Sequence, residues 1–147
     1  MANWTSAQDG DWTNASTWTA GLGYPAAAGD TVTVRHDVTY TTKLNSLGDG
    51  FGDITIANSG VLISQVEMDI DGVLLIDGGG TLHQKPGSRI YFSGTSGENH
   101  GIHFENEANA SHIAEGTDPL PTTQLTAAHD IGDTVLTVDL GTGSGFV

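Results

Sequence analysis

The sequence repeats itself at an offset of twenty residues. Shifting it by that amount superposes Val34 on Ile54, Ile54 on Leu74, and Leu62 on Leu82. One turn of a parallel β-solenoid needs about this many residues, because three short strands and three bends must close a coil stacked ~4.8 Å above the previous one. The interior columns of such a solenoid are expected to contain Val34, Ile54, Leu74, Ile56, Ile76, Leu62, Leu82, Ile70 and Ile90.

Short runs of β-branched and aliphatic residues bounded by Gly, Asn and Asp indicate an all-β chain. The runs are 31–34, 53–56, 60–63, 72–76, 89–92 and 134–138. Only 106–114 is a candidate helix, and it has no clear apolar stripe. A β-sandwich or jelly roll is the alternative fold, but nothing in a sandwich requires matching residues at a constant offset.

Changes in composition divide the chain into four parts. Residues 1–31 form an N-terminal arm and cap, 32–94 the solenoid coils, 95–121 a polar loop and connector, and 122–147 a short β element. The cap contains Trp4, Trp12 and Trp18, whose rings are expected to cover the apolar end of the first coil while their N–H groups reach turn carbonyls. An aromatic platform for sugar is the alternative role of these tryptophans.

The charge balance excludes several classes of partner. Four cationic side chains face 18 carboxylates, which gives a net charge of −14. No patch can therefore neutralise the six or more phosphates of ordinary DNA binding, and an anionic membrane surface is equally disfavoured. Because the chain has no cysteine, it has no disulfide and no thiolate metal site. No window is apolar enough for membrane insertion, and no signal peptide is visible.

Two stretches resemble known modules. The first is Gly10-Asp11-Trp12 through Thr17-Trp18, followed by Pro25 and Gly29-Asp30-Thr31-Val32-Thr33-Val34. It resembles the opening of β-helical modules in bacterial surface proteins, in phage fibre and spike proteins, and in the eight-glycine domain of extracellular hyaluronan-associated proteins. The resemblance covers residues 10 to about 92. It implies an extracellular or virion-surface solenoid and implies no reaction.

The second stretch runs from Thr122 to Phe146 and is similar to a short β element of phage structural and fibre proteins. In those proteins the pattern usually continues past Gly-Phe into another strand. We therefore expect the natural protein to continue beyond Val147, as a fibre with a fixed base and a distal portion would.

Candidate metal ligands occur in two places. If 100–107 forms a strand, His103, Glu105 and Glu107 point to one face, but same-face residues of one strand lie ~7 Å apart, so a structural or interface role is favoured. Asp69 and Asp71 lie just before a glycine bend at Gly72 and offer calcium ligands, but they lack the twelve-residue calcium loop, so an ordinary turn is favoured. We expect no cofactor, with calcium as the alternative.

No catalytic constellation is visible, so the chain is predicted not to be an enzyme. Polysaccharide lyases and glycosidases also use parallel β-helices, but here the carboxylates are scattered over turns and the four cations form no cluster. There is also no Gly-x-Ser-x-Gly elbow.

These observations predict a structural component of a phage particle: a tail- or head-fibre base, a spike or a capsid decoration protein at the virion surface. The expected partners are other virion proteins, two further copies in a homotrimer, and a host glycan; nucleic acid is excluded. The alternative is an extracellular bacterial adhesin or carbohydrate-binding domain, either alone or attached to a polysaccharide-degrading enzyme.

Overall fold

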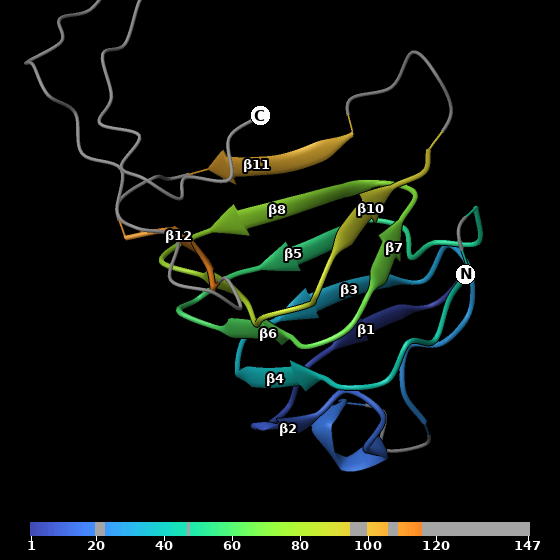
Figure 1. The fold of residues 1–147 in the computed structure, drawn as a ribbon. Helices are drawn as coiled ribbons and strands as arrows, with labels where there is room; N and C mark the ends of the chain where they lie inside the picture. The colour runs from blue at the N-terminus through green and yellow to red at the C-terminus, as the bar shows by residue number, and fades with distance from the viewer. Residues whose placement is uncertain (20–22, 47, 95–99, 106–108, 116–147) are drawn as a thin grey trace, which may run out of the picture. The chain divides into compact units, whose positions relative to one another are not determined.

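The computed structural model describes residues 1–19, 23–46, 48–94, 100–105 and 109–115. Met1–Glu115 form one compact unit. Within the described residues, the regular secondary structure is almost entirely β-strand (Figure 1). The elements are β1 (Asn3–Thr5), β2 (Gly10–Asp11), the 3-10 helix η1 (Ala15–Thr17), β3 (Thr31–Val34), β4 (Asp37–Tyr40), β5 (Ile54–Ile56), β6 (Val61–Ser64), β7 (Met68–Ile70), β8 (Val73–Asp77), β9 (Thr81–Gln84), β10 (Ile90–Phe92), β11 (Gly101–Glu105) and β12 (Ser111–Ala114).

The strands stack in parallel as a β-solenoid of about four turns, as the sequence predicted. The first sheet has the order β1-β3-β5-β8-β11, and the second has the order β12-β9-β6-β4-β2. The third contains β7 and β10, which lie side by side in Figure 1. Each coil thus contributes one strand to each of the two long sheets, and the middle coils also contribute to the third.

The constant offset of twenty residues is correct only between the middle coils. There Ile54 pairs with Leu74, and Leu62 pairs with Leu82. Between β3 and β5 the offset is 22, so Ile54 lies over Val32 rather than over the predicted Val34. An offset of 22 also separates β7 from β10.

The predicted pairing of Ile70 with Ile90 is likewise wrong, because Ile70 pairs with Phe92 and Ile90 with Met68. When the offset between paired strands changes from 20 to 22 residues, every side chain stays on the same face of its strand. The bends can therefore gain residues without turning the apolar positions outward, and a sequence comparison does not detect the change.

The core fills the space enclosed by the sheets. Its fully buried large side chains alternate with partly exposed residues along the strands, as the burial of Val32 and Val34 in β3 illustrates. Of the predicted interior residues, Val34, Ile54, Ile56, Leu62, Ile70, Leu74, Ile76 and Leu82 are buried. Ile90 is only partly buried and packs against this cluster.

The stack is longer than the predicted coil region 32–94. Strands β1 and β2 precede it, and β11 and β12 follow it within the segment predicted to be a polar loop. The candidate helix at 106–114 is not helical at its end, since Ser111–Ala114 pairs with Thr81–Gln84 of β9. The existing ladder provides hydrogen-bond partners that outweigh weak local preference. Residues 106–108 and the β element predicted at 122–147 lie outside the described part.

Tryptophans close the first coil. Trp12 and Trp18 are buried and meet edge to face, with ring centroids 5.0 Å apart. The Trp12 Nε1–H donates to the Pro25 carbonyl (2.8 Å), and the Trp18 Nε1–H donates to the Trp12 carbonyl (2.8 Å). Trp4 differs from the prediction, because its N–H donates to the Asp30 carboxylate (3.2 Å). Two of the three rings therefore have no free face for a sugar.

Glycines allow adjacent coils to approach closely at the bends. A Cβ atom added at Gly60 would lie 2.6 Å from the Val34 carbonyl oxygen, and one at Gly80 would lie 2.4 Å from the Ile56 carbonyl oxygen. No side chain fits at these distances. These two glycines thus mark the same corner on successive coils, which is the role the sequence indicated for them.

Candidate functional site

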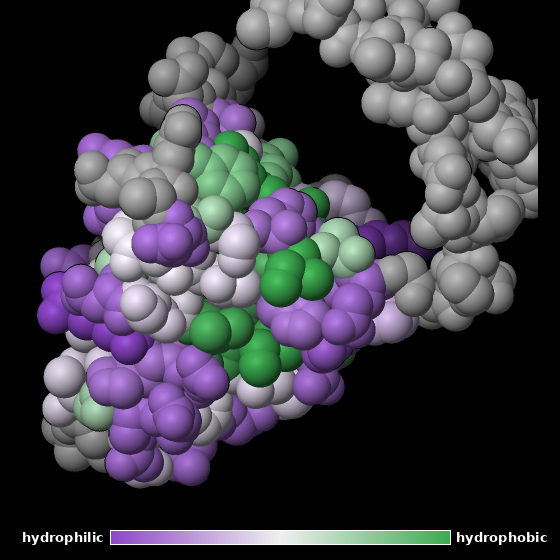
Figure 2. Space-filling view, turned by 90° about the vertical axis from the view of Figure 1, so that its left-hand side faces the viewer, coloured by the Kyte–Doolittle hydropathy of each residue, from purple (hydrophilic) through white to green (hydrophobic). Residues whose placement is uncertain are grey.

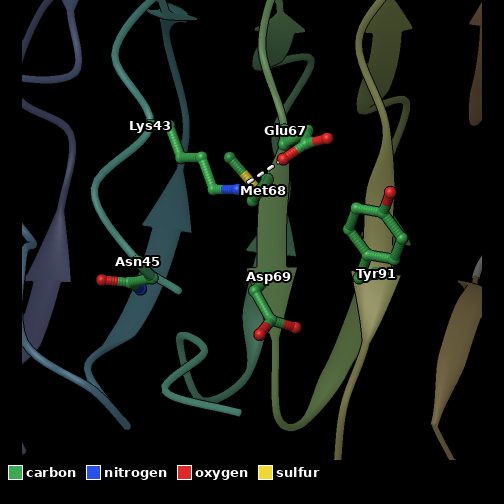
Figure 3. A pocket seen from close by; sticks show the side chains of 6 residues that line it. All are labelled: Lys43, Asn45, Glu67, Met68, Asp69 and Tyr91. Atoms are coloured by element: carbon green, nitrogen blue, oxygen red, sulfur yellow. Dashed lines mark hydrogen bonds and ion pairs between the residues drawn. The ribbon is translucent and has the colours of Figure 1, made fainter. Parts of the chain in front are cut away.

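The candidate site is a hollow of about 260 Å³ beside β7. Figure 3 shows Lys43 and Asn45 on one side of β7, and Tyr91 of β10 on the other. Glu67, Met68 and Asp69 come from the strand between them or from the residue just before it. Three segments that are distant in sequence therefore build the hollow.

The buried part of the hollow is formed by Asn45, Met68 and Asp69. Met68 belongs to the core and gives this part an apolar surface. Asp69 lies between two core residues of β7, so strand alternation directs its side chain outward. It is nevertheless buried, and its carboxylate accepts hydrogen bonds from the Gly48 N–H and the Ser93 hydroxyl, both at 2.7 Å.

The open part is formed by an ion pair and an aromatic ring. The ammonium of Lys43 donates to the carboxylate of Glu67, and both side chains keep part of their surface exposed. This hydrogen bond raises the pKa of Lys43 and lowers the pKa of Glu67, so both groups are charged at neutral pH. Tyr91 is 36% exposed and pairs across the strands with Asp69.

The wall of the hollow is close to electrically neutral, although the chain carries a net charge of −14. The carboxylates of Glu67 and Asp69 face the ammonium of Lys43 in the wall, and Arg89 lies close enough to Glu67 to help lower the pKa of that carboxyl. A guanidinium nitrogen of Arg89 donates to the hydroxyl of Tyr91 over 3.5 Å, which is the long limit for a hydrogen bond. This contact raises the pKa of Arg89, so the guanidinium stays charged. The hollow is therefore suited to uncharged polar molecules.

The two predicted pairs of metal ligands lie in different parts of the solenoid. His103 and Glu105 lie on β11 of the first sheet, with exposed side chains, whereas Asp69 lies on β7 of the third. Asp71 and Asp69 both lie 2.7 Å from the hydroxyl of Ser93. Among the described residues, no group of three His, Cys, Asp or Glu side chains is placed to hold a metal ion. Glu107 lies outside them.

Sequence reasoning singled out Asp69, as a candidate metal ligand, but missed the other five lining residues: Lys43, Asn45, Glu67, Met68 and Tyr91. A usable signal exists. Lys43 and Glu67 are 24 residues apart, which is the offset by which Asp37 of β4 pairs with Val61 of β6. Asp69 and Tyr91 are 22 apart, the offset of β7 and β10. A search that allowed the coil length to vary would have aligned these pairs.

Together, the sheets and the hollow define a parallel β-solenoid with a small polar cavity on its third face. Comparisons with protein-family models, with curated proteins and with solved structures find no match. Among the described residues, no helix is long and apolar enough to cross a membrane.

Proposed function

We propose that this chain is a non-enzymatic structural module of a phage particle: a fibre or spike base, or a capsid decoration protein. The observation that carries the proposal is the continuous parallel stack from β1 to β11, with a buried apolar interior. Such a stack is a stiff spacer, since every coil is hydrogen-bonded to its neighbours along the axis. The resemblance of residues 10–34 to virion modules supports the phage setting.

In this proposal the N-terminal coil faces the particle and the later coils face the host. The tryptophan cluster makes the first coil rigid, because its rings and N–H groups are all engaged within the fold. A rigid first coil transmits load from the particle to the projecting part. The polar exterior of that coil, rather than the buried rings, then forms the contact with other virion proteins.

The proposed assembly is a trimer held by lateral contacts. Figure 2 shows apolar side chains between hydrophilic ones on one side of the solenoid. On the outer face of the second sheet, Ile63 and Ile113 both pair with His83, so the three side chains form one column. Ile113 is 46% exposed. Packing such columns around a common axis removes apolar area from water, which favours association.

Three measurements test the proposal. Mass spectrometry of purified particles of a phage that encodes the chain should detect it in stoichiometric amounts. Light scattering of the purified protein should give three times the mass of one chain, and no acidic polysaccharide should be cleaved. A chain found only in the secreted or cell-surface fraction of a bacterium, or one that degrades a polysaccharide, would contradict the proposal and favour the bacterial alternative.

A further inference from the structure

The hollow beside β7 combines a flat aromatic ring, an exposed ion pair and a small apolar floor. We propose that it binds a single neutral sugar residue, of the size of one pyranose ring. This assignment does not depend on whether the chain is carried by a virion or by a cell surface, because it rests on the side chains that line the hollow.

Size limits the ligand. The volume of about 260 Å³ is just below the ~300–1,000 Å³ of pockets that enclose drug-sized molecules. One six-membered ring with its hydroxyl groups fits this space. A longer glycan would place one residue in the hollow and continue outside it, past the exposed side chains of Lys43 and Glu67.

The ion pair matches the hydrogen-bonding character of a sugar. Each sugar hydroxyl both donates and accepts hydrogen bonds, whereas an ammonium only donates and a carboxylate only accepts. Lys43 and Glu67 present these two functions side by side. Two neighbouring hydroxyls of one ring can therefore accept from Lys43 and donate to Glu67, and both bonds are charge-assisted.

The apolar groups match the other surface of a sugar. A pyranose ring has C–H groups on its faces, and these pack on aromatic and aliphatic surfaces. Tyr91 offers a ring that is 36% exposed, and Met68 lines the buried end. The hydroxyl of Tyr91 lies 3.5 Å from a guanidinium nitrogen of Arg89, at the edge of the hollow.

The charges in the wall disfavour ionised sugars. Glu67 and Asp69 repel the carboxylate of a uronic acid, and the net charge of −14 adds to this repulsion. Glu67 is already paired with Lys43, and Asp69 already accepts from the Gly48 N–H and the Ser93 hydroxyl, so the wall holds no unpaired carboxylate for the ammonium of a hexosamine. A neutral hexose or N-acetylhexosamine meets no repulsion and brings no charge that must lose its hydration, so the expected order of affinity is neutral above both charged classes.

The test is a two-dimensional NMR titration of the intact chain with methyl glycosides of glucose, galactose and mannose, and with N-acetylglucosamine, glucuronate and glucosamine. At least one neutral sugar should bind with a Kd on the order of 1 mM. This is the affinity expected for a ligand of about twelve non-hydrogen atoms that each contribute about −0.3 kcal/mol to the binding free energy. The resonances that shift should belong to residues 43–45, β7 and β10.

Matched variants locate the site. Tyr91→Ala should weaken binding by about tenfold or more, whereas Tyr24→Ala should leave it unchanged, since Tyr24 is also 36% exposed but does not line the hollow. Lys43→Met and Glu67→Gln should each weaken binding severalfold. The second exposed ion pair supplies their controls, Lys85→Met and Glu115→Gln, which should have no effect. Tyr91→Leu keeps a large apolar residue on β10 if Tyr91→Ala fails to fold.

Three outcomes would overturn the assignment. The first is that no neutral sugar binds up to about 50 mM, fifty times the expected Kd. The second is that a folded Tyr91→Ala or Tyr91→Leu variant binds as the parent does. The third is that glucuronate or glucosamine binds more tightly than every neutral sugar. None of these outcomes bears on incorporation into particles, which is measured separately.

Discussion

Asp30, which directly precedes β3, holds the N-terminal residues in place by hydrogen bonds. Its carboxylate accepts hydrogen bonds from the Ala2 N–H (2.7 Å), the Ala27 N–H (3.2 Å) and the Trp4 indole N–H (3.2 Å). Burial raises the pKa of this carboxyl, but the hydrogen bonds outweigh burial and the pKa is lowered from its usual 3.8. The charged form of Asp30 therefore stabilises the fold.

Replacing Asp30 should destabilise the chain. Asp30→Ala leaves three N–H donors without their partner, at a cost of about 1–3 kcal/mol of unfolding free energy. Urea unfolding followed by tryptophan fluorescence measures this cost. Asp49→Ala removes the same charge from an exposed position and should change the free energy by less than about 0.5 kcal/mol. Equal effects of the two substitutions would show that Asp30 has no special role.

Acid should weaken the parent chain partly through Asp30. Because the pKa of this group is lower in the folded state than in the unfolded state, its stabilising contribution is complete above pH 3.8 and is lost as the pH falls through the folded-state pKa. The unfolding free energies of the parent and Asp30→Ala should therefore converge below about pH 4. A difference that stays constant from pH 7 to pH 3 would contradict this linkage.

At the scale of the strands, parallel pairing fixes which residues of successive coils are neighbours. Thr33 of β3 lies beside Thr55 of β5, and Thr55 lies beside Leu75 of β8. A strict twenty-residue repeat would instead put Arg35 beside Thr55. Since these side chains point away from the core, they can be changed without disturbing the interior.

Engineered cysteines distinguish the two registers. The chain has no cysteine of its own, so each pair is unambiguous. Thr33→Cys with Thr55→Cys should oxidise to a disulfide, because neighbouring parallel strands place the Cα atoms ~4.8 Å apart, within the disulfide range. Thr55→Cys with Leu75→Cys is the positive control. Arg35→Cys with Thr55→Cys should remain reduced, and faster oxidation of this last pair would contradict the 22-residue offset.

At the scale of the whole molecule, each coil is stabilised mainly by the coils directly above and below it. Leu74 lies between Ile54 and Ile102 in the first sheet and is buried. In the last described coil the apolar positions are less protected, and Phe104 is 45% exposed. Stability should therefore fall from the middle coils toward β11 and β12.

Substitution and hydrogen exchange measure this gradient. Leu74→Ala should cost about 2–5 kcal/mol of unfolding free energy, as for a fully buried leucine. Ile102→Ala, on the neighbouring strand of the same column, should cost less because Ile102 is only partly buried. Amide protection should be highest in β5 and β8 and lowest in β12. Uniform protection across all coils would indicate that the solenoid unfolds as a single unit.

The strands β3, β5, β6, β8 and β10 followed from the sequence alone, whereas the predicted runs did not include the other strands. The alternation of Val32 and Val34 with threonines, and the glycines at Gly60 and Gly80, are local signals that predict a strand, its inner face and a bend without knowledge of the partner strand. The coil length is not a local property. It depends on how many residues each bend holds, and an addition of two residues leaves the inward and outward pattern unchanged.

The residues that line the hollow could not be predicted from the sequence, because the number of residues in each bend is not a local property. Its side chains come from three segments whose distance from one another is set by unequal bends, so that Lys43 meets Glu67 and Asp69 meets Tyr91 at different offsets. Asp69 is buried although its strand position faces outward, because the Gly48 N–H and the Ser93 hydroxyl reach it from segments distant in sequence. Periodicity within a strand determines which way a side chain points, whereas only the packing of the bends decides what it meets there.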